Sequence, residues 1–182
     1  MMEKTKNKFL EIAVIGLKLL LICAIIAGIV SFVYDLTLKK YEANIQETKN
    51  KAIGQIFGKE GLDCKEVDTG VYTVKENGIL IGYCVEAVGK GFGGDIQLMV
   101  GYDTEKNIKA VEIIGHSETP GVGDKVKNPD YLANYQEKSG ELTLGTDVDK
   151  IAGASVSSRG VMAGVNAATK ALEAYLAEGG AK

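Results

Sequence analysis

The sequence predicts an α+β protein with one N-terminal transmembrane helix and a soluble antiparallel-sheet domain with flanking helices. Three features of the 182-residue chain support this fold class. A long apolar segment lies near the N-terminus, short alternating strands separated by turn residues occupy the middle, and a helix with an apolar stripe closes the chain. This length allows one modest domain and an appendage.

The first element is the apolar segment Ile12–Val33, in which Lys18 is the single charge. At about 1.5 Å per residue, a helix of this length crosses a hydrocarbon core of roughly 30 Å. A cleaved signal peptide would have a shorter apolar core, and a buried soluble helix would have a polar face. A retained transmembrane helix over residues 12–34, after a cytoplasmic tail at residues 1–11, is therefore the preferred interpretation.

Basic residues on the two sides of the span predict its orientation. Lys4, Lys6 and Lys8 precede it, whereas Lys39 and Lys40 follow it a few residues later. The more basic side of a span stays in the cytoplasm. We therefore expect a single-pass protein of the plasma membrane, surrounded by lipid, with a cytoplasmic N-terminus and its C-terminal domain on the outer face.

Residues 35–58 are predicted to continue from the span as a stalk helix. Tyr41, Ile45 and Ile56 recur there at helical spacing, with Lys and Glu between them. The remaining residues, 59–182, are assigned to the sheet-containing domain.

The middle of this domain is predicted to be an antiparallel meander. An Asn-Gly pair at residues 77–78 separates the apolar runs Val71–Val74 and Ile79–Val85, which is a strong hairpin signal. Two further strands are expected at Asp95–Tyr102 and Ile108–Ile114.

Beyond the sheet, a short helix is expected over Pro129–Lys138 and a strand or extended segment over Leu142–Thr146. The last helix is predicted from Ser158 to about Ala177, because Val161 and Val165 belong to an apolar stripe with helical spacing.

Composition excludes several classes of function. The net charge is -3 and no dense basic block is present, so no nucleic-acid partner is expected. His116 is the only histidine, which excludes a catalytic His pair, and the three cysteines do not have zinc-ligand spacing, so no metal site is predicted. Cys64 and Cys84 either form a disulfide outside the cell or, as we prefer, remain two separate thiols.

The segment Asp149–Arg159 is the most informative part of the chain. Gly153 and Ala154 let the backbone approach a bulky group, and the helix that follows offers free N–H groups and a positive dipole end to a phosphate. Arg159 can add a cationic partner. A simpler interpretation is that one of the two serines before Arg159 caps the helix.

The pattern Asp149-x-x-Ala152-Gly-Ala-Ser155, followed by hydroxyl residues and a helix, resembles the flavinylation motif of the FMN-binding domain family. That family includes the G subunit of Rnf-type electron-transport complexes and the C subunit of the sodium-pumping NADH:quinone oxidoreductase. In it, the hydroxyl residue after Gly-Ala receives FMN as a phosphoester, which corresponds to Ser155. The family usually has Ser or Thr in place of Ala152 and Thr as the acceptor. Attachment at Ser157, or FMN without a covalent link, therefore stays open.

A second segment, His116–Gly123, resembles the loop that these subunits place beside the flavin, and the glycine-rich turn Gly89–Gly94 is also typical of the domain. Glu118 and Thr119 are candidates for polar contacts to the isoalloxazine ring or the ribityl chain. The resemblance implies an FMN site formed by Ser155, Gly153, Ala154, Ser157, Ser158, Arg159, His116, Glu118, Thr119 and Gly121.

The resemblance also implies an electron-transfer subunit of a membrane complex that couples ferredoxin:NAD oxidoreduction to sodium or proton translocation, without an independent catalytic site. Its partners would be an integral subunit that also carries FMN, small integral subunits around an iron–sulfur centre, and peripheral subunits that handle ferredoxin and NAD. A flavin transferase would attach the FMN from FAD. The alternatives are a membrane-anchored extracytoplasmic flavoprotein reductase outside such a complex, and an anchored binding or assembly protein without a cofactor.

Overall fold

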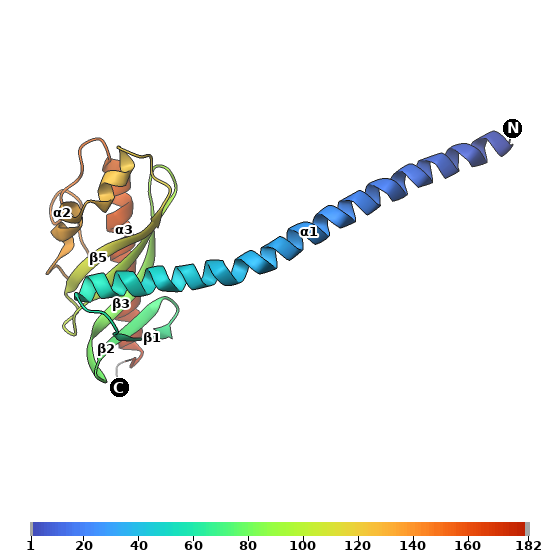
Figure 1. Ribbon diagram of the computed structural model, residues 1–182. Helices are drawn as coiled ribbons and strands as arrows, with labels where there is room; N and C mark the ends of the chain where they lie inside the picture. The colour runs from blue at the N-terminus through green and yellow to red at the C-terminus, as the bar shows by residue number, and fades with distance from the viewer. Residues whose placement is uncertain (1, 181–182) are drawn as a thin grey trace. The chain divides into compact units, whose positions relative to one another are not determined.

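The computed structural model describes residues 2–180 (Figure 1). Internal contacts divide the chain into two units, residues 1–46 and 47–182, which are described separately. The elements in chain order are α1 (Met2–Phe57), β1 (Asp63–Asp68), β2 (Val71–Glu76), β3 (Ile79–Lys90), β4 (Asp95–Tyr102), β5 (Ile108–His116), the 3-10 helix η1 (Gly123–Lys127), α2 (Pro129–Leu132), the 3-10 helix η2 (Ala133–Tyr135) and α3 (Ser155–Ala177).

The first unit consists of most of α1. It contains the segment Val14–Tyr34, which has 21 residues, a mean hydropathy of 2.6 and no buried part. This segment is long and apolar enough to cross a membrane, and it overlaps the predicted span. The predicted stalk is part of the same continuous helix, which ends at Phe57. The division into tail, span, stalk and domain stays a prediction.

The second unit is built on a five-stranded antiparallel sheet in the order β1-β2-β3-β4-β5, which confirms the predicted meander. At the predicted hairpin, Glu76 pairs with Ile79, and Asn77 and Gly78 have φ values of 51° and 80°. Positive φ at both positions is the requirement of a type I′ turn. The edge strand β1 was not predicted, because its sequence is mostly charged and lacks an apolar alternation.

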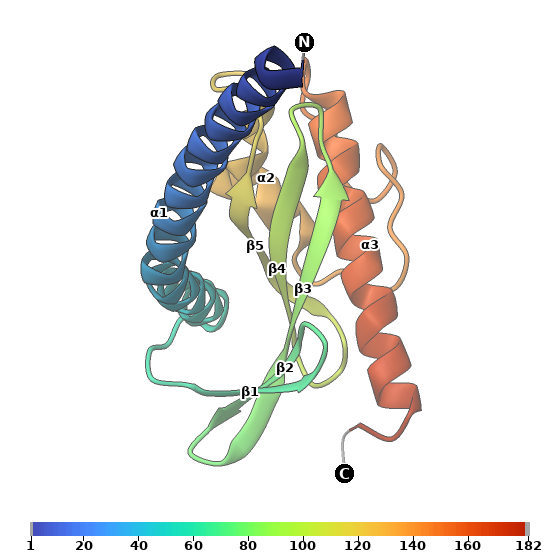
Figure 2. The ribbon, with the colours of Figure 1, turned by 90° about the vertical axis from the view of Figure 1, so that its right-hand side faces the viewer.

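Helices cover both faces of this sheet (Figure 2). On one face, Val85 and Leu98 pack with Val165 of α3 in the larger apolar core. On the other face, Ile53 from the last turns of α1 packs with Met99 in a second core. The last turns of α1 therefore contribute directly to the domain, and α3 is held against the face opposite to them.

The two elements predicted between β5 and α3 differ from the structure. The helix expected over Pro129–Lys138 is the short α2 continued by η2, and it ends at Tyr135, because Gln136 is extended with a ψ of 144°. The next residue, Glu137, has a φ of 61°, which a helix does not allow. The extended segment expected over Leu142–Thr146 contributes a single bridge, between Leu144 and Val148.

Cys64 and Cys84 are both free thiols, in agreement with the preferred interpretation. They lie on β1 and β3, which are separated by β2. Strands two apart are about 9–10 Å from one another, beyond the Cα separation of about 7 Å that a disulfide spans. Burial raises the pKa of both thiols, so neither is poised as a thiolate.

A polar cluster joins the end of α1 to the sheet. The Lys49 Nζ lies 2.6 Å from Glu86 Oε1 and 3.3 Å from the Tyr72 hydroxyl, which itself donates to Glu86. Burial, reinforced by the bond to Glu86, raises the pKa of Tyr72 to about 12. Burial alone would lower the Lys49 pKa, but the bonds to Glu86 and Tyr72 outweigh it and raise that pKa.

We expect the domain to lose stability as the pH rises from about 10 to about 12, and Tyr72→Phe to reduce that loss. Folded Tyr72 keeps its proton up to its raised pKa of about 12, whereas a tyrosine in the unfolded chain loses its proton near pH ~10. The stability that comes from a raised pKa is complete below the unfolded value and is lost as the pH rises through the folded value. Thermal unfolding across this range measures the effect, with the exposed Tyr41→Phe as control. An identical alkaline loss in wild type and Tyr72→Phe would contradict this expectation.

Candidate functional site

A pocket of about 540 Å³ brings together three segments that are far apart in the sequence. They are the glycine-rich turn between β3 and β4, the loop after β5 and the start of α3, which lie at the same end of the sheet (Figure 2). The sequence had singled out all three segments. The pocket is lined by Phe92, Glu118, Thr119, Val122, Gly123, Gly153, Ala154, Ser155, Val156 and Ser157.

The helix α3 begins at Ser155, and the predicted start at Ser158 was wrong. Gly153, with a φ of 81°, turns the chain into the helix, and Ala154 precedes it without a side-chain cap. The Ser158 N–H donates to the Ala154 carbonyl at 2.9 Å, so the N–H groups of residues 155–157 have no partner within the helix. These groups and the positive end of the helix dipole favour an anion at this position.

The three serines at the start of α3 have different surroundings. Ser155 is exposed and lines the pocket. Ser157 is 1% exposed, and its Oγ donates to Glu118 Oε2 at 2.6 Å. Ser158 is fully buried, and its Oγ accepts from the Ile151 N–H at 3.1 Å. Neither buried serine caps the helix, and Ser155 is the one of the three that is exposed.

Glu118 is a buried carboxylate that connects the walls of the pocket. Its Oε1 accepts from the Gly93 N–H at 3.1 Å, and its Oε2 accepts from Ser157. A Cβ added to Gly91 would lie 1.9 Å from Oε1, and one added to Gly123 would lie 2.0 Å from Oε2. The glycines therefore leave the space that this carboxylate occupies, and both of its oxygens already have partners within the protein.

His116 and Gly121 shape the loop after β5 and do not line the pocket. The Nδ1 of His116 accepts from the Glu118 N–H at 3.1 Å, which fixes the backbone where the carboxylate side chain begins. Gly121 has a φ of 77° in a turn where the Thr119 carbonyl accepts from the Gly123 N–H at 3.1 Å. Both residues therefore support the loop from outside the pocket.

Arg159 is exposed and lies one helical turn beyond Ser155, on the same side of α3. It does not line the pocket. Its position allows the guanidinium to reach an anion held near Ser155 without breaking an existing ion pair, since no ion pair of Arg159 occurs among the residues that the structure describes.

An apolar rim, formed by Phe92, Val122 and Val156, was not predicted. These side chains are 78%, 49% and 44% exposed, although all three contribute to the pocket. Burial of apolar surface is favourable by about 25 cal/mol per Å². A flat ligand that covers the rim would therefore bind more tightly. The signal in the sequence was a large apolar residue next to small and polar residues in each segment.

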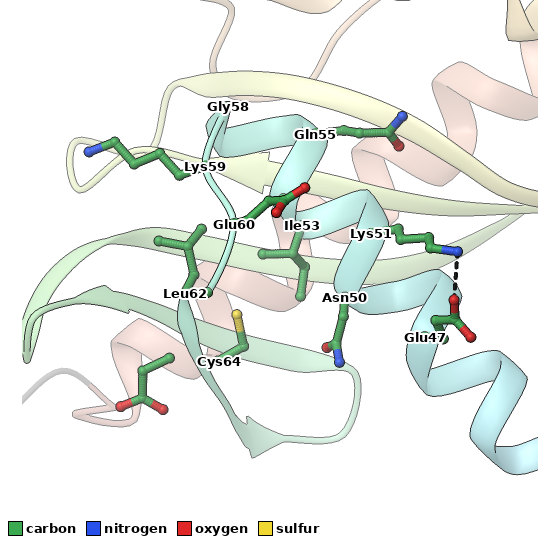
Figure 3. A pocket seen from close by; sticks show the side chains of 13 residues that line it. Glu47, Asn50, Lys51, Ile53, Gln55, Gly58, Lys59, Glu60, Leu62 and Cys64 are labelled. Carbon is green, nitrogen blue, oxygen red and sulfur yellow. Dashed lines mark ion pairs between the residues drawn. The ribbon is translucent and has the colours of Figure 1, made fainter.

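A larger, open cavity of about 1060 Å³ lies between the last turns of α1, residues 58–62 and the start of β1 (Figure 3). None of the predicted site residues lines it. Its lysines are paired with acids, Lys51 with Glu47 at 2.6 Å and Lys59 with Glu76 at 2.6 Å. It therefore offers an ionic ligand little net attraction, and the smaller pocket at α3 is the better candidate site.

The smaller pocket suits a planar aromatic ligand with a phosphate group. The rim offers apolar surface, the start of α3 offers unpaired N–H groups, and Ser155 offers a free hydroxyl. Within residues 2–180, no group of three or more His, Cys, Asp or Glu side chains is placed to hold a metal ion.

Comparison with known protein families agrees with the chemistry of this pocket. Residues 91–170 match the FMN-binding domain, and this range contains residues 91–94 of the glycine-rich turn, the loop after β5 and most of α3. This match agrees with the resemblance to the FMN-binding domain family that the motifs indicated.

Over more of its length, the chain is similar to G subunits of ion-translocating complexes. It is 28% identical over 168 residues to the G subunit of the ion-translocating oxidoreductase complex of Haemophilus influenzae, which covers 78% of this chain and 79% of that protein. It is 28% identical over 134 residues to the G subunit of the Na(+)-translocating ferredoxin:NAD(+) oxidoreductase complex of Acetobacterium woodii, which covers 68% and 65%. The crystal structure of NqrC from Shewanella oneidensis is also similar, with 29% identity, a TM-score of 0.47, and coverage of 53% and 52%.

Proposed function

We propose that this protein is an electron-transfer subunit that carries FMN bound covalently to Ser155 through a phosphoester. The observation that supports this most directly is the convergence of an exposed hydroxyl, unpaired helix N–H groups and an apolar rim on one pocket of about 540 Å³. Pockets for small ligands have volumes of roughly 300–1,000 Å³. When bound, FMN supplies one- and two-electron transfer.

In the proposed attachment, the Ser155 oxygen forms a bond to the flavin-side phosphorus of FAD, the pyrophosphate bond breaks, and AMP and the hydroxyl proton leave. A flavin transferase supplies the base, because both oxygens of Glu118, the carboxylate in the pocket, accept bonds from Gly93 and Ser157. The N–H groups of residues 155–157 and the Arg159 guanidinium then stabilise the negative charge of the phosphodiester. Gly153 and Ala154 leave the approach to Ser155 open, since they carry almost no side chain.

The other lining residues orient the ring and exclude water. Phe92, Val122 and Val156 present apolar surface to the isoalloxazine, and the Thr119 hydroxyl lies in the lining where it can donate to a polar atom of the ring or the ribityl chain. No side chain in the pocket is free to act as a general base, so the proposed role is electron transfer without an independent catalytic site.

We also propose that the apolar helix crosses the plasma membrane once. The cytoplasmic tail is residues 1–11, the span 12–34, the stalk 35–58 and the FMN-binding domain, on the outer face, 59–182. The relatives are named as subunits of ion-translocating complexes, one of them a ferredoxin:NAD(+) oxidoreductase. We propose that the partners of this protein are the other subunits of such a complex, which couple this electron transfer to sodium or proton translocation, and, as the resemblance implies, that one of them is an integral subunit that also carries FMN.

We expect the flavin on this chain to become reduced in its native membranes when reduced ferredoxin or NADH is added. The chain should co-purify in mild detergent with multi-span subunits, and its band on a denaturing gel should retain flavin fluorescence. Flavin absorbance before and after the reductant, with the complex solubilised and dissociated as control, measures the transfer. A covalent flavin that stays oxidised, on a chain that purifies alone, would instead support an anchored flavoprotein reductase outside such a complex.

A further inference from the structure

We propose that Glu118 is a positioning residue, which holds the first turn of α3 against the glycine-rich turn so that the Ser155 hydroxyl faces the pocket. This inference rests on the proposed attachment of FMN to Ser155. It assigns Glu118 a role through protein contacts, in place of the direct flavin contact that the sequence had indicated.

The Glu118 carboxylate bonds to two different walls of the pocket. Glu118 is 5% exposed, its Oε2 accepts from Ser157 Oγ at 2.6 Å and its Oε1 accepts from the Gly93 N–H at 3.1 Å. One side chain thus connects the glycine-rich turn to the start of α3, and the loop after β5 lies between them. A charge-assisted hydrogen bond of this length is among the stronger ones in proteins.

Helical periodicity relates the orientation of Ser157 to that of Ser155. Successive residues of an α-helix are rotated by about 100°, so residues two apart lie about 200° apart around the axis. The bond from Ser157 to Glu118 directs Ser157 into the protein, where it is 1% exposed. The same rotation directs Ser155 outward, in agreement with its exposure.

The first turn of α3 lacks a conventional cap. Ala154 precedes α3 and makes no side-chain cap bond, so the usual way of fixing a first turn is missing. The bonds of Ser157 to Glu118 and of Ser158 to the Ile151 N–H fix this turn instead. Of these two bonds, only the one to Glu118 reaches another wall of the pocket.

The same bond also distinguishes between the serines. The Ser157 hydroxyl is buried and donates to Glu118, so it is withheld from a flavin transferase. Ser155 is exposed in the pocket. Glu118 thus favours attachment at Ser155 over attachment at Ser157.

The test measures steady-state FMN attachment to the full-length chain in detergent, with a purified flavin transferase and FAD. Wild type is compared with Glu118→Gln, Ser157→Ala and the double variant, and with Glu141→Gln, an exposed carboxylate paired with Lys170, as matched control. We expect kcat to fall at least about tenfold in both single variants, because a misplaced nucleophile slows transfer, while KM for the chain stays within about twofold. The double variant should be no slower than the slower single variant, because Ser157→Ala removes the bond between Ser157 and Glu118 and Glu118→Gln weakens the same bond by removing its charge.

Thermal unfolding of each protein before attachment separates positioning from folding. A purely structural role would leave the kcat of the folded fraction unchanged. If Glu118→Gln fails to fold, the same comparison with wild type is made with Ser157→Ala, which removes only the hydroxyl. A wild-type kcat in the folded single variants, or additive effects in the double variant, would contradict the positioning role of Glu118 and leave the proposed function intact. If wild type takes up no FMN, the proposed function is refuted and this inference falls with it.

Discussion

The Ser155→Ala protein is expected to fold and to reach the membrane without any covalent flavin. The Ser155 side chain is exposed and has no hydrogen-bond partner within the part of the chain that the structure describes, so its removal breaks no hydrogen bond. The nearby serines cannot replace it, because Ser157 and Ser158 are buried and hydrogen-bonded. Flavin fluorescence of the denatured protein measures the loss.

Two further variants serve as controls for this result. Ser155→Thr should retain the flavin, because threonine offers the same hydroxyl chemistry at the same position. Ser157→Ala should acquire FMN slowly but reach the same end point, since the acceptor itself is intact. Fluorescence that persists at full strength in Ser155→Ala would show that FMN is attached to another residue and would contradict the assignment.

The second large effect is expected from Gly89→Ala, at the contact between β3 and α3. A Cβ at this position would lie 1.9 Å from the Gly160 carbonyl oxygen, which belongs to the helix backbone and cannot move by a change of rotamer. Alanine at Gly160 would approach the Lys90 carbonyl oxygen to 2.5 Å, so the close approach is reciprocal. We expect Gly89→Ala to lower the free energy of unfolding by about 3 kcal/mol, as overpacking does in other cores.

Because Gly160 follows the first turn of α3, this substitution should also displace Ser155 and slow FMN attachment. Denaturant unfolding of the full-length proteins measures the stability change. The neighbouring Val88→Thr, on an exposed side chain of the same strand, should change stability by less than about 0.5 kcal/mol. Equal stability of Gly89→Ala and wild type would show that the two backbones are not in close contact.

Elements with a strong local signal could be predicted from the sequence. The Asn-Gly pair at residues 77–78 fixed the hairpin, because few residues tolerate positive φ at two successive positions. The strand Asp95–Tyr102 was predicted with its observed ends, since apolar residues alternate along it. The edge strand Asp63–Asp68 has no such alternation, because neither of its faces is fully buried.

The candidate site was predictable only in part. The motifs around Ser155 and Glu118 identified the segments, but the start of α3 was misplaced because Ala154 gives no capping signal. The bond between Glu118 and Ser157 joins residues 39 apart in the sequence, so only the tertiary fold brings them together. For the same reason, the sequence indicated a flavin contact for Glu118, whereas both of its oxygens are engaged within the protein.

The most direct test of the central claim uses the tryptic peptide Ile151–Arg159, which lies between the cleavage sites after Lys150 and Arg159. The chain is purified from its own membranes, digested and analysed by tandem mass spectrometry. We predict a peptide heavier by the mass of FMN less water, with fragment ions that place the added mass on Ser155. An unmodified peptide from cells with an active flavin transferase, or an added mass on Ser157 or Ser158, would contradict the account.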